Sequence, residues 1–365
     1  MRICVTTVQG LEDISSKEIE SLGCKIVEIR KGRVIADCDL KTVVRLNYLA
    51  RTIERVLVLL KVERFERIDD LYKIVKEIDF SFIKPDQSFA IRPLRVGSHD
   101  FTSLDVGRVC GKAVIDSYME SEGVRLRVNL NEPDIIVRVD VIHDEVYVGL
   151  DTTGDRALHR RGYRVYNHPA PLNPSIASAL VMISKWKCDE ILVDPMCGSG
   201  TILIESAMIC RNIPPQKFRE DFQFTKIWNS ELLDEVKCEV IERHVDLDLV
   251  GIERFSKHLR GAKLNSKKAG VLDTIDYIVG DATKLCLKDV DVIVTNPPYG
   301  FRIARKGLIE DLYRGFLKSA EIADRLVVIT AEYKILKEKA LNLGYEIEER
   351  KIKYGGLDAK IFVLR

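Results

Sequence analysis

The sequence predicts an α/β protein whose C-terminal half is a doubly wound parallel sheet and whose N-terminal half is of the α+β type. Its 365 residues are more than one ordinary core holds, so two or more domains are expected. Strand and helix patterns are mixed up to residue 151 and alternate regularly after Pro171, which is typical of βαβ units. Residues 152–170 show neither period and are rich in Arg, His and Gly, which indicates a linker.

Composition narrows the class of protein. With 46% hydrophobic and 31% charged residues the chain is expected to be globular, and its net charge of +1 means that any nucleic-acid surface must be local. The nine cysteines contain no CxxC pair, which favours reduced thiols in a cytoplasmic protein and indicates no metal site. No segment resembles a membrane span or an export signal. We therefore expect a monomer with no membrane contact and no obligate protein partner.

The N-terminal half divides into two predicted units. In the first 57 residues we expect a strand at 3–7, a helix at 12–22, strands at 25–29 and 33–37, and a helix at 40–60. From about residue 69 we expect a helix at 70–77, a strand at 89–93, a helix at 103–121 and a hairpin of strands 135–142 and 145–150.

Four predicted strands of the C-terminal half end at polar residues. Strands 191–193, 249–252, 277–279 and 292–295 are followed by Asp194, Glu253, Gly280-Asp281 and Asn296. In open α/β sheets ligands bind outside the carboxyl ends of the strands, so these residues are expected to line one crevice. A fifth strand at 326–330 and an antiparallel hairpin of 346–354 and 359–364 complete the predicted sheet.

The first of these strand ends carries a glycine-rich turn. It runs Asp194, Pro195, Met196, Cys197, Gly198, Ser199, Gly200, Thr201 and opens a helix. Glycines let the backbone approach a ligand, and free N–H groups at a helix start bind a carboxylate or phosphate. The spacing is neither that of a Walker loop nor GxGxxG, so nucleoside triphosphates and dinucleotides are disfavoured. Alone, the turn fits a ligand site and a ligand-free βα connection equally well.

Two acids follow the next two strands. Glu253 is placed to accept hydrogen bonds from ribose hydroxyls, and Asp281, before Ala282, to accept one from an adenine amine. Glu253 lies 59 positions after Asp194, whereas about 20 is usual. An insertion at 213–246, with aromatics at Phe218, Phe222, Phe224 and Trp228, must therefore separate them. Each acid alone is more often a solvated carboxylate. Three suitable strand ends in order favour a site.

The segment Asn296-Pro297-Pro298-Tyr299-Gly300 is the most specific feature. An aryl amine is a poor nucleophile because its lone pair is delocalised into the ring. If the carbonyls of Asn296 and Pro297 both accept its N–H bonds, the amine is held and its lone pair turns toward an incoming methyl group. Tyr299 can stack on the base. The alternative is a Pro-Pro turn after a buried strand, which the place of the segment in the strand series disfavours.

These motifs resemble those of Rossmann-type amino-methyltransferases over residues 171–365, and the C-terminal antiparallel hairpin is usual there. The resemblance implies a seven-stranded sheet, S-adenosylmethionine as cofactor and S-adenosylhomocysteine as product. It implies a catalytic segment of Asn296, Pro297, Pro298 and Tyr299. It implies cofactor contacts at Pro171, Leu172, Asp194, Pro195, Cys197, Gly198, Ser199, Gly200, Thr201, Glu253, Asp281, Ala282 and Asn296.

The N-terminal half resembles a THUMP domain behind a ferredoxin-like segment, as in tRNA-modifying enzymes. The similarity rests on Phe89 to Pro93, Gly107-Arg108 and Tyr147 to Asp151, and the linker segments 158–164 and 168–172 resemble the join in THUMP methyltransferases. It implies a ferredoxin-like segment at 1–57, a THUMP domain at 58–151, a basic linker at 152–170 and a catalytic domain at 171–365.

Within that group the expected reaction is methylation of guanosine N2 in tRNA. Asn rather than Asp at position 296 resembles the enzymes that act on guanosine 6 of the acceptor stem more than those that act on guanosine 10, and 23S rRNA guanine enzymes with a THUMP domain also have Asn. Guanosine 10 of tRNA and a 23S rRNA guanine remain alternatives. A DNA adenine-N6 methyltransferase would carry a domain that reads the major groove, and no such motif is seen. A non-catalytic RNA-binding protein would be indicated by a broken Asn-Pro-Pro-Tyr segment or glycine turn, and both are intact.

Local clusters of cations indicate how RNA would bind. We expect the THUMP-like unit to hold the 3′ acceptor end by shape, and the target guanine to swing out of its helix into the pocket. Any single arginine is more often solvated or in an ion pair. The candidate RNA contacts are Arg92, Arg95, Arg108, Arg160, Arg161 and Arg164.

Overall fold

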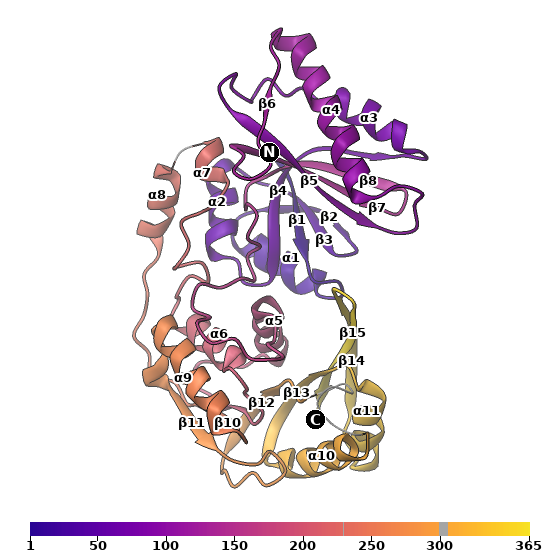
Figure 1. Ribbon diagram of the computed structural model, residues 1–365. Coiled ribbons are helices and arrows are strands. Elements are labelled where there is room, and N and C mark those ends of the chain that lie inside the picture. The colour runs from indigo at the N-terminus through magenta and orange to yellow at the C-terminus, as the bar shows by residue number, and fades with distance from the viewer. Residues whose placement is uncertain (229, 299–305) are drawn as a thin grey trace.

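The computed structural model describes residues 1–228, 230–298 and 306–365, and Figure 1 shows two halves, each built on one sheet. The N-terminal half has a mixed eight-stranded sheet in the order β2-β3-β1-β4-β8-β7-β5-β6. Its elements are β1 (Arg2–Thr7), α1 (Glu12–Ser21), β2 (Lys25–Arg30), β3 (Arg33–Asp37), α2 (Leu40–Leu49), β4 (Ile53–Arg64), α3 (Ile68–Lys76), β5 (Ser88–Val96), α4 (Ser103–Glu122), β6 (Arg127–Val128), β7 (Ile135–Ile142) and β8 (Glu145–Asp151).

Strand β4 corrects the prediction of a helix over 40–60. The helix α2 ends at Leu49, Ala50 is extended, and residues 53–64 form a strand that pairs with both β1 and β8. Sheet pairing on both sides of this Val- and Leu-rich segment outweighs its local helix propensity. Because β4 runs from Ile53 to Arg64, the predicted domain boundary between residues 57 and 58 falls inside one strand.

The C-terminal half is a seven-stranded sheet, as predicted, and its strand order is β11-β10-β9-β12-β13-β15-β14. Its first five strands are parallel, and β14 and β15 form the antiparallel hairpin at the edge. The strands are β9 (Leu192–Asp194), β10 (Leu249–Glu253), β11 (Ile275–Val279), β12 (Val290–Thr295), β13 (Ala323–Thr330), β14 (Ile347–Tyr354) and β15 (Leu357–Leu364).

Helices cover both faces of this sheet. One core cluster holds side chains of α5 (Pro174–Ser184), α6 (Thr201–Cys210) and α9 (Ser256–Ala269). The other holds side chains of α10 (Lys306–Ser319) and α11 (Tyr333–Asn342). The arrangement is that of a doubly wound sheet with layers on both faces. No helix of the described residues is both long enough and apolar enough to cross a bilayer.

The insertion between α6 and β10 returns to the N-terminal half. It carries α7 (Phe224–Ile227) and α8 (Glu231–Glu239), which lie beside α2 in Figure 1. Phe222, Phe224 and Val236 are buried in one cluster with side chains of β1 and α2. At the surface Lys41 and Arg45 of α2 pair with Glu239. The insertion therefore holds the two halves together.

A buried polar cluster joins the linker to the catalytic half. We call the set Arg51, Arg161, Tyr163, Ser178 and Glu205 the joint cluster. The Glu205 carboxylate of α6 is fully buried and accepts hydrogen bonds from Arg161 Nε (3.2 Å), Tyr163 Oη (2.9 Å) and Ser178 Oγ (2.6 Å). Arg161 also donates to the Arg51 carbonyl (2.7 Å), and Arg51 donates to two carbonyls of the catalytic half. Hydrogen bonds of this cluster thus join the N-terminal half, the linker and the catalytic half.

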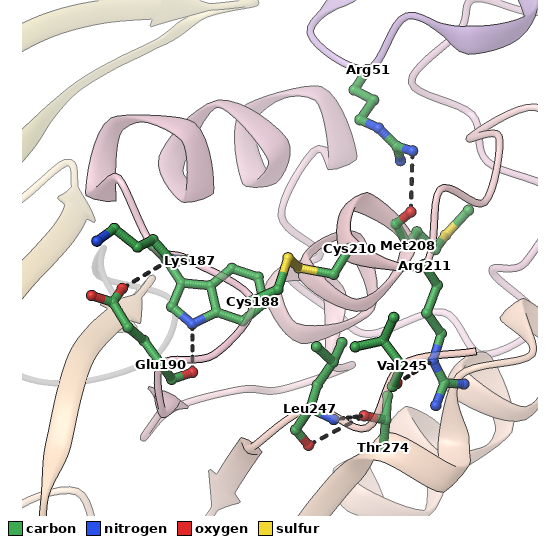
Figure 2. The surroundings of a disulfide bond; sticks show 11 residues. Arg51, Lys187, Cys188, Glu190, Met208, Cys210, Arg211, Val245, Leu247 and Thr274 are labelled. Carbon is green, nitrogen blue, oxygen red and sulfur yellow. Dashed lines mark hydrogen bonds between the residues drawn. A yellow bond between two sulfur atoms is a disulfide. The ribbon is translucent and has the colours of Figure 1, made fainter. Parts of the chain in front are cut away.

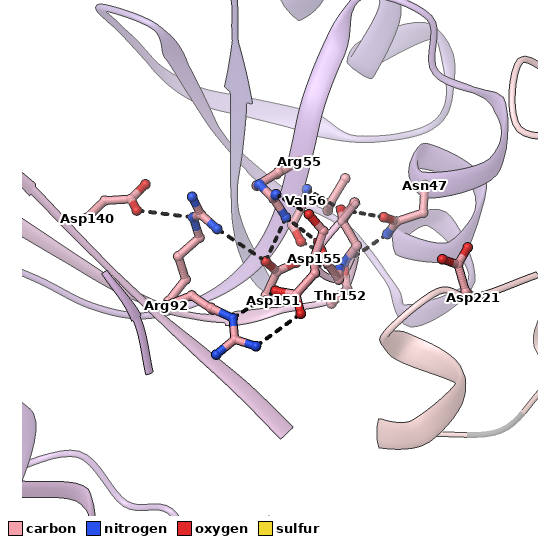
Figure 3. A network of polar contacts seen from close by, with 12 residues as sticks. Asn47, Arg55, Val56, Arg92, Asp140, Asp151, Thr152, Asp155 and Asp221 are labelled. Carbon is pink, nitrogen blue, oxygen red and sulfur yellow. Dashed lines mark hydrogen bonds and ion pairs between the residues drawn. The ribbon is translucent and has the colours of Figure 1, made fainter. Parts of the chain in front are cut away.

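A second polar network lies where β4 meets β8 (Figure 3). Asp151, at the end of β8, is buried and pairs with Arg55 of β4 at 3.1 Å and with Arg138 of β7 at 3.7 Å. Next to it, Asn47 of α2 donates to Thr152 Oγ1 (2.8 Å). Arginine partners on two strands thus fix β8, the last strand of the N-terminal half, at the start of the linker.

A disulfide corrects the expectation that all cysteines are reduced. Cys188 follows α5 and Cys210 is the last residue of α6, and their Cα atoms lie 5.8 Å apart (Figure 2), within the range that a disulfide spans. The pair is 22 positions apart in the chain, so no CxxC spacing announces it. The fold, not a local motif, brings the two sulfurs together.

Candidate active site at the carboxyl edge of the C-terminal sheet

The sheet brings the four predicted strand ends together. Strands β11, β10, β9 and β12 are adjacent, with Gly251 of β10 aligned with Asp194 of β9. Thr295, the last residue of β12, donates from Oγ1 to Asp194 Oδ1 at 2.7 Å. The Gly280 N–H, just after β11, donates to the Glu253 carbonyl at 3.2 Å. The candidate residues therefore line one edge of the sheet.

Asp194 is a buried carboxylate at the centre of this edge. Besides Thr295 it accepts one N–H bond, from Met196 at 3.2 Å. Burial above all, with the nearby charge of Glu253, raises the pKa of Asp194 to about 7. A positive group bound next to it would favour the ionised form. The electrostatics at this point suit a cationic ligand.

The glycine turn is folded against β10 and β11. Two of its N–H groups donate to the end of β10: Cys197 to the Ile252 carbonyl (3.0 Å) and Gly198 to Glu253 Oε2 (3.1 Å). Gly200 has φ of +77°, and a Cβ at that position would lie 2.4 Å from the Tyr277 hydroxyl. Only glycine fits there, so the turn can bring its backbone close to the carboxylates and start α6 at Thr201.

Glu253 and Asp281 offer carboxylate oxygens at the next two strand ends. Glu253 Oε1 accepts from the Phe255 N–H at 2.9 Å. Asp281 Oδ1 accepts from the N–H and hydroxyl of Thr283, and these hydrogen bonds lower the pKa of Asp281. Both side chains are half-buried, and Ala282 beside them is buried. A carboxylate oxygen accepts more than one bond, so both acids can still bind hydroxyl or amine donors.

Asn296 differs from the other residues of the edge. Its Oδ1 atom is buried, and no residue in the described part of the chain donates to it. The two prolines that follow are fixed: Pro297 is buried, and the Pro298 carbonyl accepts from Tyr313 Oη at 3.3 Å. A buried acceptor without a donor is costly unless a ligand supplies one. Tyr299, which we expected to stack on a base, lies outside the described residues.

The linker covers the glycine turn. Asn265 of α9 accepts from the N–H groups of Val165 and Tyr166 and donates to the Ser199 carbonyl. The His168 ring lies in van der Waals reach of a Cβ at Gly198. Burial, and then His258, lower the pKa of His168, so its ring is neutral at pH 7. The linker is thus part of the site and not a free tether.

Three residues with contacts at the site, Thr295, Asn265 and Tyr313, were not predicted from the sequence. Thr295 directly precedes the Asn-Pro-Pro segment, so its position at the same strand end was a usable signal. Asn265 and Tyr313 lie on helices far along the chain from the residues they contact. Their buried polar side chains have no local pattern that marks them.

The predicted RNA-contacting arginines have different environments. Arg161 is fully buried in the joint cluster, so the expectation that it contacts RNA is wrong. Arg164 is half-buried and donates to the Leu172 carbonyl (2.7 Å) and Thr201 Oγ1 (3.1 Å). Arg92 pairs with Asp155, and Arg108 with Asp105. The remaining two, Arg95 and Arg160, make no ion pair with a described residue, and Arg160 is exposed.

Pro171 and Leu172 lie next to Arg164, which donates to the Leu172 carbonyl. Both line a cavity of about 550 Å³ between the linker and the C-terminal hairpin. Among the described residues no group of three or more His, Cys, Asp or Glu side chains is arranged to hold a metal ion. The site is therefore made of backbone donors, carboxylates and one amide.

Comparison with known proteins identifies this architecture. Residues 161–361 match the model of the RMKL-like methyltransferase domain, residues 65–151 that of the THUMP domain, and residues 2–57 that of the RlmL ferredoxin-like domain. The chain belongs to this methyltransferase family. The methyltransferase is 54% identical over 375 residues to the tRNA (guanine(6)-N2)-methyltransferase of Methanocaldococcus jannaschii, covering 99% of this chain and 98% of that protein.

Two further relatives agree. A protein of the same name from Archaeoglobus fulgidus is 50% identical over 370 residues, covering 100% of the methyltransferase and 92% of the relative. The crystal structure of a possible methylase from Clostridium difficile superposes with a TM-score of 0.87 at 28% identity, covering 100% of this chain and 97% of that one. The ferredoxin-like, THUMP and Rossmann-type parts thus occur together in the same order elsewhere.

Proposed function

We propose that this methyltransferase transfers a methyl group from S-adenosylmethionine to the exocyclic N2 of guanosine 6 in the acceptor stem of tRNA. One observation carries the proposal: Asn296 presents a buried amide oxygen that no described residue satisfies, at the strand end beside the glycine turn. The two relatives at 54% and 50% identity bear the name of that reaction and support the choice of nucleotide.

The chemistry follows from the direction of the acceptors. The guanine amine donates its two N–H bonds to Asn296 Oδ1 and to the Pro297 carbonyl, which turns its lone pair away from them. S-adenosylmethionine supplies an electrophilic methyl group on a positively charged sulfur. After transfer the nitrogen is a strong acid and releases its proton to water, so no side chain has to act as general base.

The strand ends fit the cofactor. The carboxylates of Glu253 and Asp281 would accept hydrogen bonds from the ribose and the adenine, and the N-terminus of α6 would offer backbone N–H groups to the carboxylate of the amino acid part. The raised pKa of Asp194 marks a place where a cation is favoured, and the cofactor carries an ammonium and a sulfonium.

The tRNA binds across both halves. The THUMP domain holds the acceptor stem and 3′ end, and the chain acts as a monomer in the cytoplasm. The insertion with α7 and α8, together with the joint cluster, keeps the THUMP domain at a fixed distance from Asn296. Such a distance selects a nucleotide by its place in the RNA shape.

The test is transfer of labelled methyl groups to unmodified tRNA transcripts, with the modified nucleoside mapped by mass spectrometry. The wild type yields N2-methylguanosine at position 6, and Asn296→Ala loses the product while still binding cofactor. Asn131→Ala, an exposed asparagine of the THUMP domain, serves as the control and retains activity. Product at position 10 of tRNA or in 23S rRNA would show that the enzyme acts on that nucleotide instead of guanosine 6. An absence of label in any RNA would contradict the proposal.

A further inference from the structure

The cavity between the linker and the C-terminal hairpin lies next to the active site without belonging to the cofactor crevice. In the parallel register of β12 and β13, Thr295 is aligned with Val328. The residues that follow are Asn296 on one strand and Ile329 on the other, and Ile329 lines the cavity. Arg164 lines it too and donates to Thr201 Oγ1, at the end of the glycine turn where α6 begins.

The charge of the cavity is one-sided. Its lining includes His159, Arg160, Arg161 and Arg164, and no aspartate or glutamate is among the described residues that line it. Glu54, the acid behind the wall, is already engaged: His159 Nδ1 contacts it, and Asn173 Nδ2 donates to it at 3.2 Å. Arg161 is neutralised by Glu205 and His159 contacts Glu54, so the positive charge of the cavity comes from Arg160 and Arg164.

Polar groups with unused capacity face this space. Arg160 is exposed, and none of the described acids pairs with it. Arg164, whose Nη2 donates to the Leu172 carbonyl and to Thr201 Oγ1, also lines the cavity and adds its charge to it. On the opposite wall the half-buried Tyr354, at the tip of the hairpin, has its hydroxyl 3.5 Å from His159 Nε2. Arginine donors and a phenol together suit an anion that carries a sugar or base.

We infer that this cavity binds the RNA backbone beside the target, taking the phosphodiester and ribose next to the extruded guanosine. The inference rests on the proposed function and names the residues that act on the substrate side of it. Swinging a base out rotates its backbone, and contacts to the adjacent phosphates hold that rotated state. Arg160 binds the phosphate, Arg164 adds positive charge from the wall of the cavity, and Tyr354 packs against the ribose.

Salt dependence tests this directly. The full-length protein, saturated with S-adenosylhomocysteine, is titrated with unmodified tRNA transcript at several salt concentrations. Losing one phosphate contact lowers the slope of log Kd against log salt by roughly 0.7–0.9. Arg160→Ala is expected to show this loss and to weaken binding about tenfold at low salt. Arg160→Lys keeps the charge, so it should retain most of the slope.

Controls separate this site from the rest of the protein. Arg243→Ala removes an exposed arginine of the insertion, outside the cavity, and should leave the slope unchanged. The affinity for S-adenosylhomocysteine should be the same in all variants. Tyr354→Ala is expected to raise the Kd for RNA without changing the slope, because it removes no charge.

Equal slopes for Arg160→Ala and wild type would overturn the inference, even if the wild type methylates tRNA normally. Because binding is measured without turnover, failure of the methyl-transfer assay would be seen separately and would count against the proposed function alone.

Discussion

Two buried polar sites in the catalytic half show opposite states of hydrogen bonding. In the joint cluster the Glu205 carboxylate has three side-chain donors, and its partner Arg161 is fully buried with it. At the carboxyl edge the Oδ1 atom of Asn296 is equally shielded from solvent and has no described donor. A buried carboxylate with its donors inside the fold stabilises the fold, whereas a buried acceptor without one can bind a donor of the ligand.

The largest expected effect on stability is that of removing the Glu205 carboxylate from the joint cluster. Glu205→Ala removes the acceptor and leaves Arg161 buried without its counter-charge, which lowers the free energy of unfolding by about 3–5 kcal/mol. Denaturant unfolding followed by circular dichroism measures it. Glu321→Ala, at an exposed glutamate, should change it by less than about 0.5 kcal/mol. Similar stabilities for the two variants would mean that burial does not distinguish the sites.

The next largest effect is expected on catalysis, from removing the Asn296 amide. Asn296→Ala should lower kcat by a factor of about 10²–10³, comparable to loss of one preorganised polar group in an active site. Its free energy of unfolding should stay within about 1 kcal/mol of wild type, because no described hydrogen bond to Oδ1 is lost. Single-turnover kinetics and denaturant unfolding on the same preparations check both values. A large loss of stability would show that Asn296 is structural after all.

Asp194 lies between these extremes, with two donors but a raised pKa. A folded-state pKa of about 7, above the unfolded value near 3.9, means that the folded state binds a proton that the unfolded state has lost. Without cofactor, this group therefore costs stability as pH rises from about 4 to about 7, by at most about 1.4 kcal/mol per pH unit. Asp194→Asn should remove that slope.

The measurement is the difference in unfolding free energy between wild type and Asp194→Asn across pH 4–8. The wild type should lose stability relative to the variant up to about pH 7, and the difference should then level off. A difference that is constant with pH would contradict the raised pKa.

The smallest effect concerns exposed arginines. Arg108 pairs with Asp105 at 2.6 Å, but its side chain is 79% exposed. Solvent weakens such pairs, so Arg108→Ala should change the free energy of unfolding by about 0–1 kcal/mol. Thermal unfolding of the variant checks this, and a loss as large as that of Glu205→Ala would remove the contrast between buried and exposed charges.

The sequence predicted the positions of the strand-end residues better than the environments of the arginines. Asp194, Glu253, Asp281 and Asn296 could be placed because each directly follows an apolar strand, and parallel strands put such positions at one edge. Arg161 and Arg160 are neighbours in the same basic segment, yet one is buried and the other exposed. Only tertiary contacts with α6 distinguish them, and no local pattern records these contacts.

The other differences have the same origin. Residues 53–64 form β4 because strands from two distant parts of the chain pair with them. Cys188 and Cys210 meet because α6 packs on α5, not because of their spacing. Motif and period predict what is local, and pairing partners decide the rest.

The insertion also has a consequence for the order in which the chain matures. The hydrophobic cluster around β1 and α2 includes Phe222, Phe224, Leu233 and Val236. During synthesis from the N-terminus, the ferredoxin-like part therefore leaves the ribosome with part of its apolar surface uncovered. That surface is covered only after the THUMP domain and the first part of the catalytic domain have also been made. The ferredoxin-like part is thus completed by the segment that carries α7 and α8, and a nascent chain paused before residue 222 would leave this apolar surface exposed.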